Sequence, residues 1–225
     1  MKQLSSIITI IFMFGLLYAG TMEYIGGTYT GDIKDGVPNG KGKLVLSSAI
    51  YEGDWVDGKR HGKGKMTWLD GDKYIGDFYK DKVHGNGKFI WKNGQIYDGH
   101  FKNGKMSGYG VAKNPSGLCY EGFFENDMYN GLGRLKTTSK EVVEGFFVNN
   151  RIHGYGEHYQ TNGQVYKGYF KFGSPNGFGI MYDKNGFVMV QGIWNGGDLI
   201  TNMSKADYEK KHGKLKGWGV VLKDK

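Results

Sequence analysis

Histidine recurs at regular spacing in this chain, and its imidazole can bind metals or transfer protons. His61, His84 and His153 occupy the same position of a repeated segment. Asparagine takes this position in three other segments, at Asn39, Asn130 and Asn176. A zinc site needs ligands that converge on one ion, and asparagine is a poor substitute for histidine there. We therefore interpret the shared position as a hydrogen-bonding position in a turn.

Glutamate recurs in the same way, once in each of three segments, at Glu52, Glu121 and Glu144. Catalysis by paired carboxylates needs two acids in one cleft, whereas a repeated row on the expected solvent side provides no cleft. Gly-x-Gly is also frequent, but no copy lies between a strand and a helix, so it is no phosphate loop. The sequence thus predicts a protein that is not an enzyme, with no catalytic residues, no metal ion and no cofactor.

These positions belong to a repeat of 23 residues. Tyr51-Glu52-Gly53-Asp54-Trp55 returns as Tyr74-Ile75-Gly76-Asp77-Phe78 and in four later copies, the last at Tyr166. A first copy begins at Tyr29 and a truncated last copy begins at Val190. A fixed short period predicts a stack of small units, whose function lies on the long faces of the stack.

Each repeat is predicted to form one β-hairpin. Counting from the opening tyrosine as position 0, positions 0, 2 and 4 share one face of a strand. Turn residues such as Asn103-Gly104 follow near positions 7 to 11, and a second strand follows them. The aromatic residues at position 4 are expected to form a buried structural ladder: Trp55, Phe78, Phe101, Phe124, Phe147, Phe170 and Trp194. We expect position 4 to face the glycine at position 13, and position 3 to face position 14.

The run Tyr51-Glu52-Gly53-Asp54-Trp55, followed by Gly58-Lys59-Arg60-His61-Gly62-Lys63-Gly64, resembles the MORN (membrane occupation and recognition nexus) repeat. The resemblance extends from Tyr29 to about Trp194, with Val143 and Val190 in place of the opening tyrosine. It implies an all-β fold, an elongated single antiparallel sheet of stacked β-hairpin repeats. It also implies a scaffold that binds partner peptides or a second copy along the sheet, and membrane association.

Three segments are expected along the chain. Residues 1–20 carry Lys2 and an apolar run from Ile7 to Ala19, which predicts a signal peptide or a membrane anchor. Residues 21–198 form the array of about eight units. Residues 199–225 form a C-terminal helix and cap segment, with helix signals from Ser204 to Gly213. We expect Lys214 to Leu222 to supply the second strand of the last hairpin. The predicted localisation is therefore exported, periplasmic or secreted, or membrane-anchored.

The net charge of +8 is unevenly distributed along the chain. About half of this excess belongs to the short tail after residue 201, so the array has no basic stripe that would follow a phosphate backbone. We therefore expect no nucleic-acid partner.

The variation that informs on function lies at positions 3 and 12. Position 3 is Asp32, Asp54 and Asp77 in the first units and becomes aromatic later, while position 12 changes from lysine to mostly aromatic residues. The aromatic side chains are candidate partner-binding residues: Phe123, Phe146, Tyr169, Tyr109, Tyr155 and Phe178. Two interpretations remain open. The segment after residue 198 covers this face, or the face is an exposed groove for a partner.

The predicted function is a non-enzymatic repeat scaffold that binds a protein or peptide partner along its sheet face, self-association included. The alternative is a module for anionic lipids or membrane surfaces, which uses scattered lysines and the basic C-terminal tail. Added salt separates the two, because it weakens lysine-mediated lipid attachment far more than aromatic contacts.

Overall fold

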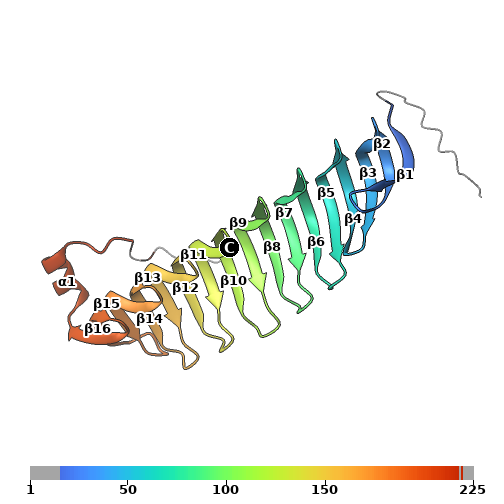
Figure 1. Cartoon of the computed structure of the whole chain (residues 1–225). Coiled ribbons are helices and arrows are strands. Elements are labelled where there is room, and N and C mark those ends of the chain that lie inside the picture. The colour runs from blue at the N-terminus through green and yellow to red at the C-terminus, as the bar shows by residue number, and fades with distance from the viewer. Residues whose placement is uncertain (1–15, 218, 220–225) are drawn as a thin grey trace, which may run out of the picture. The chain divides into compact units, whose positions relative to one another are not determined.

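The computed structural model describes residues 16–217 and 219, and it is all-β apart from one short helix (Figure 1). The chain divides into two compact units, Met1–Lys82 and Val83–Lys225. The strands of the first unit are β1 (Tyr18–Tyr24), β2 (Gly27–Lys34), β3 (Val37–Leu46), β4 (Ala49–Val56), β5 (Lys59–Trp68) and β6 (Lys73–Tyr79).

The strands of the second unit are β7 (Lys82–Ile90), β8 (Ile96–Lys102), β9 (Lys105–Lys113), β10 (Cys119–Glu125), β11 (Met128–Lys136), β12 (Val142–Val148), β13 (Arg151–Tyr159), β14 (Val165–Lys171), β15 (Ser174–Tyr182), β16 (Val188–Asn195) and β17 (Asp198–Asn202). Within each unit, every strand pairs antiparallel with its neighbours in sequence, as the repeat pattern predicts. The helix α1 (Lys205–His212) follows the last strand.

The hairpin turns match the residues that occupy them. Between β4 and β5, Asp57 and Gly58 have φ angles of +48° and +74°. Two successive residues with positive φ are the requirement of a type I′ turn, which asparagine, aspartate and glycine tolerate best. Later hairpins close with the same two positive φ angles, as at Asn103 and Gly104 (+54° and +86°), although Lys80 and Phe172 take the first turn position in two of them.

The register of the hairpins differs from the expected one. In the β4–β5 hairpin, Gly53 pairs with Gly64, and the next paired residues are Asp54 and His61. A bulge therefore follows the glycine at position 2, and it absorbs two residues of the second strand. The expected facing of positions 4 and 13, and of 3 and 14, is wrong. Position 2 faces position 13, and position 1 faces position 14.

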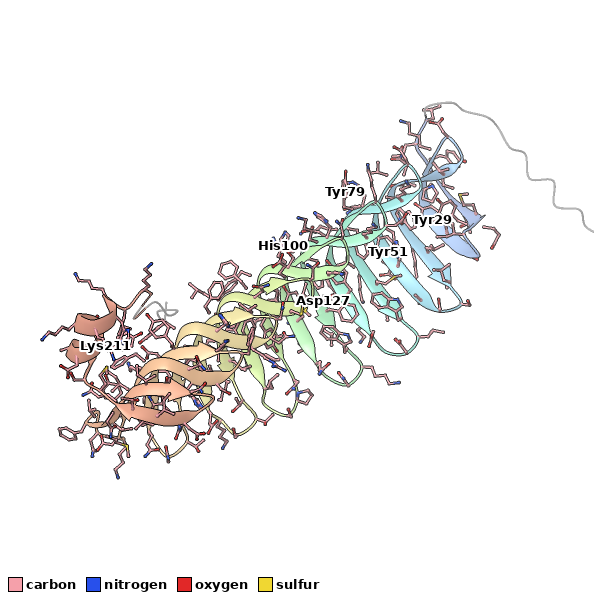
Figure 2. The ribbon with its side chains drawn as sticks, turned by 60° about the vertical axis from the view of Figure 1, so that its left-hand side comes forward. Tyr29, Tyr51, Tyr79, His100, Asp127 and Lys211 are labelled. Carbon is pink, nitrogen blue, oxygen red and sulfur yellow. The ribbon has the colours of Figure 1, made fainter. Side chains whose placement is uncertain are left out.

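The core is a single layer of rings on one face of the sheet, which we call the ladder face. Tyr51 is fully buried, and its ring lies 5.2 Å from that of Trp55 and 5.0 Å from that of Phe78. Its hydroxyl donates to the carbonyl oxygen of Asp54 at 2.9 Å. Tyr51 comes from β4, and Figure 2 labels it together with Tyr29, its equivalent on β2. The opening tyrosine is thus as central to the core as the aromatic residue at position 4.

The glycine at position 13 makes room for the opening tyrosine. A Cβ atom on Gly64 would lie 2.5 Å from the ring of Tyr51, which is far inside van der Waals contact. In the second unit, a Cβ atom on Gly133 would collide in the same way with the Tyr120 hydroxyl. The side chain that packs against this glycine is therefore the tyrosine at position 0, whereas we expected the aromatic residue at position 4.

The aromatic residues at position 4 lie on the ladder face in both units. Six of them are 1–5% exposed: Trp55, Phe78, Phe101, Phe124, Phe147 and Phe170. The seventh, Trp194, is half-buried near the end of the array, and its indole donates to the carbonyl of Gly179 at 3.2 Å.

The two ends of the array are closed differently. At the N-terminal end, β1 pairs with β2 and places Ala19 opposite Asp32. Most of the predicted signal segment, residues 1–15, lies outside the described residues. At the C-terminal end, β17 completes the last hairpin by pairing with β16. The expectation that Lys214 to Leu222 supplies this strand is wrong, because residues 214–217 form irregular turns and β17 is the strand that pairs with β16.

In the described part of the chain, no helix has the length and apolar character needed to cross a membrane.

Candidate binding face

The face opposite the ladder face, which we call the outer face, carries a row of cross-strand pairs. Each pair joins position 12 of one hairpin to position 3 of the next, and we call this series the outer row. Its members are Lys41–Asp54 and Lys63–Asp77 in the first unit, and Asn86–His100, Tyr109–Phe123, Leu132–Phe146, Tyr155–Tyr169 and Phe178–Ile193 in the second. The side chains that change from charged to aromatic along the sequence are therefore direct neighbours across strands.

In the first unit the outer row is held by ion pairs. Lys63 contacts the Asp77 carboxylate at 2.6 Å, and Lys41 contacts that of Asp54. The Asp54 carboxylate also accepts the backbone N–H of Lys63 at 2.9 Å, across the bulge. Burial raises the pKa of the Asp54 carboxyl, but the hydrogen bonds from Lys41 and Lys63 outweigh burial and keep this pKa below its usual value. This part of the outer row is therefore polar, and its charged side chains are paired with one another.

In the second unit the outer row presents an apolar surface to solvent. We define the aromatic patch as Tyr109, Phe123, Leu132 and Phe146, on β9 to β12. The three rings are 46%, 44% and 45% exposed, in chain order. The rings of Tyr109 and Phe123 meet edge to face, with centroids 5.6 Å apart. Large rings exposed side by side are unusual on a soluble surface and typical of binding sites.

Tyr109 adds a polar group to the rim of this patch. Its hydroxyl donates to Glu121 Oε1 at 2.6 Å. This hydrogen bond to a carboxylate, together with desolvation, raises the pKa of Tyr109 to about 12. The ring is therefore held in one orientation by its hydroxyl while its face stays open to solvent.

Further along the outer row, the C-terminal segment covers the pairs. Tyr155 is 6% exposed, Phe178 is fully buried and Tyr169 is half-buried. The Tyr208 ring on α1 lies 5.0 Å from that of Phe178, and the Tyr169 hydroxyl donates to the carbonyl oxygen of Lys216. Figure 1 shows α1 beside the last strands. Both open interpretations therefore apply, each to a different stretch: the pairs on β13 to β16 are covered, and those on β9 to β12 are open.

The cover also leaves a hollow of about 480 Å³ between α1 and the sheet. His153, Tyr169 and Phe178 line it from the sheet, and Tyr208, His212 and Leu215 line it from the C-terminal segment. The helix itself has no buried residue, and Lys211 on it is exposed (Figure 2). The cover therefore rests on a few side chains and does not form a tightly packed second layer.

A buried charge network next to the covered pairs was missed by the sequence reasoning. Glu144 on β12 and Glu157 on β13 lie opposite each other and are only 8% and 6% exposed. Arg134 contacts Glu144 at 3.1 Å, and Lys167 contacts Glu157 at 2.9 Å. Glu144 was expected on the solvent side, and that expectation is wrong. The sequence does carry a signal, because charges of opposite sign alternate at positions 14 and 1. This signal can be recognised only when the register that pairs position 14 with position 1 is known.

The Glu157 carboxylate is satisfied by more than its ion pair. The hydroxyls of Tyr155 and Tyr159 donate to its two oxygens at 3.1 and 2.6 Å. Burial raises the pKa of Glu157, but these hydrogen bonds and Lys167 outweigh burial and lower the pKa below its usual value. The Glu157 carboxylate is therefore charged at neutral pH, and it lies on the outer face beside the outer row.

The repeated histidines do not converge, and they lie on β5, β7 and β13 and not in the turns as expected. His153 Nδ1 is buried and has no hydrogen-bond partner among the described residues. His61 Nδ1 accepts the backbone N–H of Gly62 at 3.1 Å, and His84 Nδ1 accepts that of Asn103 at 3.4 Å. Among the residues described by the structure, no three histidine, cysteine, aspartate or glutamate side chains are grouped as metal ligands.

The ladder face offers a second concave surface in the second unit. It is a hollow of about 450 Å³ that crosses β8 to β11. Most of its lining is apolar, namely Trp91, Tyr97, Met106, Leu118, Phe124 and Tyr129. Tyr97 and Phe124 also belong to the core, so this hollow and the fold share residues, whereas the aromatic patch is separate from the core.

The fold and these faces define a class of protein built from antiparallel β-hairpin repeats. The MORN repeat family matches residues 29–48, 51–73, 74–96, 97–119, 120–139, 144–165 and 166–188, so the chain belongs to the MORN repeat family. A comparison with curated proteins found no match.

Two solved structures are similar to this chain at low identity. One is the TCP domain of Drosophila melanogaster SAS-4 (dCPAP) in complex with a proline-rich motif of Ana2 (dSTIL), with 12% identity, a TM-score of 0.43, and coverage of 68% of this chain and 84% of that chain. The other is the TCP10 domain of Danio rerio CPAP in complex with a peptide of STIL, with 12% identity, a TM-score of 0.29, and coverage of 79% and 100%.

Proposed function

We propose that this protein is a non-enzymatic scaffold that binds a protein or peptide partner along the outer face of its second unit. The observation that carries the proposal is the aromatic patch, in which Tyr109, Phe123 and Phe146 are each exposed by nearly half. Exposed rings lower solubility, and natural sheets usually place charges at such positions. The first unit of the same chain does so with Lys41–Asp54 and Lys63–Asp77.

The patch has the features of a binding hot spot. Aromatic side chains provide large contact area with few rotatable bonds, so little conformational entropy is lost when they are covered. The Tyr109 ring is oriented in advance by Glu121, which reduces this loss further. The surrounding ion pairs, such as Arg134–Glu144, supply a polar rim.

The test is a comparison of two triple variants. Tyr109→Asp, Phe123→Asp and Phe146→Asp together place three charges in the patch. Val56→Asp, Ile75→Asp and Tyr79→Asp place three charges on exposed apolar residues of the first unit, and they serve as the control. Proteins that bind the unaltered chain are isolated from its native compartment and identified by mass spectrometry, and the affinity of each is then titrated.

We expect the patch variant to lose about thirtyfold or more in affinity, or roughly 2 kcal/mol, with a nearly unchanged melting temperature. The control variant should bind like the unaltered chain. Equal binding by both variants would refute the proposal. Anionic vesicles serve as the opposing arm: binding that depends on the vesicles and disappears between roughly 0.1 and 0.5 M salt would favour the lipid alternative.

We propose further that the protein is exported or membrane-tethered through its N-terminal segment. Lys2 and the apolar run from Ile7 to Ala19 support this proposal, because they have the charge and length of a signal segment. Protein from the native host should either lack about 19 or 20 residues by intact mass or fractionate with membranes. A full-length chain that remains soluble in the cytosol would refute both forms.

A further inference from the structure

The strand β1 forms an open edge of the first unit. It pairs with β2 over seven residues, from Tyr18 opposite Ile33 to Tyr24 opposite Gly27, without a shift in register. Figure 1 shows β1 as the outermost strand at this end. Among the described residues, no strand pairs with the other side of β1. The backbone N–H and C=O groups on that side are therefore available to a further strand.

The repeat pattern identifies β1 as half of a hairpin. Gly20 on β1 pairs with Gly31, just as Gly42 on β3 pairs with Gly53. Gly20 thus occupies position 13, which belongs to the second strand of a unit. The second strands inside the first unit, β3 and β5, each have a strand on both sides, whereas β1 has one on a single side in the described part of the chain.

The ladder face shows the same incompleteness at Gly20. A Cβ atom on Gly42 would collide with the ring of Tyr29, which comes from the first strand of the same hairpin. At Gly20 the nearest heavy atoms are Ile33 Cδ1, at 3.0 Å from such a Cβ atom, and the ring of Tyr18 on the same strand. The ladder face therefore ends at β1 without the side chains that a preceding strand supplies elsewhere.

The edge also lacks the usual protection against strand pairing. Natural edge strands are blunted by lysine, proline, bulges or a cover. β1 contains no lysine, arginine or proline, and Glu23 is its one charged residue. Leu17 and Ile25 flank the strand and are 56% and 64% exposed. By contrast, β17 at the C-terminal end has five residues, pairs through a bulge and is followed by α1.

The sequence of β1 is nearly symmetric about Thr21, and this symmetry suits a second copy of the same strand. In an antiparallel pair centred on Thr21, Tyr18 of one copy lies opposite Tyr24 of the other. Gly20 then lies opposite Met22, whose side chain can occupy the space that the glycine leaves. Alternation places all four residues on the ladder face. Both copies would thus extend their ladder faces across the contact.

The outer face of this pair is compatible with the same register. Thr21 lies opposite its own copy, and threonine pairs across strands are favourable. Glu23 lies opposite Ala19, so the two carboxylates do not face each other. No like charges oppose the pairing in this register.

We propose that two copies of this chain associate through β1, paired antiparallel about Thr21, so that their sheets continue into each other. A two-fold contact uses the same surface of both copies and therefore closes at a dimer. The aromatic patch belongs to the second unit, so the dimer presents two patches and binds a divalent partner with avidity. Removal of the chain up to Ala19 would leave Gly20 to Tyr24, which keeps the centre of the contact.

The test is a cross-link at the two-fold axis of the full chain. In a Cys119→Ser background, Thr21→Cys brings the two introduced thiols opposite each other. Thr28→Cys on β2 is the matched control. Thr21 and Thr28 are both exposed, and each makes one side-chain hydrogen bond, to Thr30 and Glu23. Mild oxidation is followed by mass spectrometry, and both variants are compared at the same concentration or in the same membranes.

We expect disulfides between chains to form about tenfold or more faster with Thr21→Cys than with Thr28→Cys. Equal rates would overturn the inference. A mixture of Thr21→Cys and Ile200→Cys chains tests head-to-tail pairing of β1 with β17. Mixed disulfides in preference to those between two Thr21→Cys chains would overturn the inference and assign the edge to an open filament.

A charge at the same position gives a second test without a cross-link. Thr21→Lys places two like charges opposite each other, and the dissociation constant of the dimer should rise about fivefold. Thr28→Lys adds the same charge away from the edge and should leave this constant nearly unchanged. Sedimentation equilibrium measures both. An unaltered chain that stays monomeric at every concentration at which it is soluble, or equal effects of the two variants, would overturn the inference.

Discussion

The outer row differs between the two units of this chain although the backbone beneath it is the same. In the first unit, Lys63 and Asp77 face each other across strands as an ion pair. In the second unit, Tyr109 and Phe123 occupy the corresponding positions and expose their rings. In both units the ladder face below is built from the same tyrosines, glycines and position-4 aromatics. The fold is therefore maintained on one face while the other face is free to differ in chemistry.

The largest expected effect is unfolding at high pH, which tests the buried tyrosines that the two units share. Burial raises the pKa of Tyr29 in the first unit and of Tyr97 in the second to about 12. Because the tyrosine pKa is higher in the folded chain, these residues contribute their full share to the free energy of unfolding below pH 10, the ordinary tyrosine value. This contribution is lost as the pH rises from about 10 through about 12. We expect both units to unfold in this window, followed by tyrosinate absorbance and circular dichroism. Tyrosines that titrate near pH 10 while the fold stays intact would contradict the shared ladder.

The next effect separates the two faces at adjacent residues. Phe147 is 1% exposed on the ladder face, and Phe146 is 45% exposed on the outer face of the same strand. Phe147→Ala should lower the free energy of unfolding by about 3–5 kcal/mol, because it leaves a cavity. Phe146→Ala should lower it by less than about 1 kcal/mol. Urea denaturation measures both, and similar losses for the two variants would mean that the outer row is part of the core.

A smaller effect probes the buried Glu157 carboxylate, which lies beside the covered pairs on the outer face. Glu157→Gln removes the charge that faces Lys167 and accepts from Tyr159, and it should cost about 1–3 kcal/mol. Because the folded-state pKa of Glu157 is lowered, its contribution is present above the ordinary glutamate value and lost as pH falls through the folded value. The variant should therefore differ from the unaltered chain at pH 7 and converge with it in acid.

The control for this network is Glu52→Gln in the first unit. Glu52 is exposed and pairs with Lys43 at 2.9 Å on the surface, so this change should cost less than Glu157→Gln. Denaturant titrations of both variants at neutral and acidic pH make the comparison. Equal costs would show that burial does not distinguish the two carboxylates.

The smallest effect on stability is expected when charged and aromatic pairs of the outer row are exchanged between the two units. Lys41→Tyr with Asp54→Phe gives the first unit an aromatic pair, and stability should change by at most about 1 kcal/mol. Self-association should increase, because the new rings are exposed and uncovered. Sedimentation velocity measures it, with Tyr109→Lys and Phe123→Asp as the reverse exchange. Unchanged association in both exchanges would show that the outer row does not control contacts between molecules.

The hairpins and their core could be predicted because they follow from spacing within each repeat. The alternation of positions 0, 2 and 4 places Tyr51 and Trp55 on one face, and the turn residues bound each strand. The register could not be predicted from this pattern. The bulge between Gly53 and Asp54 depends on the paired glycines of two strands, and strand periodicity alone does not reveal it.

The candidate face was predictable in part. The change from Asp77 to Phe123 at position 3 identified the outer row, including the residues that prove to be exposed. Phe178 packs against Tyr208, 30 residues later in the chain, and no local pattern encodes such a contact. The burial of Phe178 and that of Glu144 emerge only at the level of tertiary packing.

The hydroxyl of each opening tyrosine returns to the backbone three residues later, as in Tyr97 to the carbonyl of His100 at 2.9 Å and Tyr120 to that of Phe123 at 3.0 Å. This bond anchors the main chain at position 3 whatever side chain stands there. Single substitutions can therefore alter the outer row one hairpin at a time without passing through misfolded intermediates. Duplication or loss of a whole 23-residue repeat would lengthen or shorten the outer row in fixed steps of one hairpin.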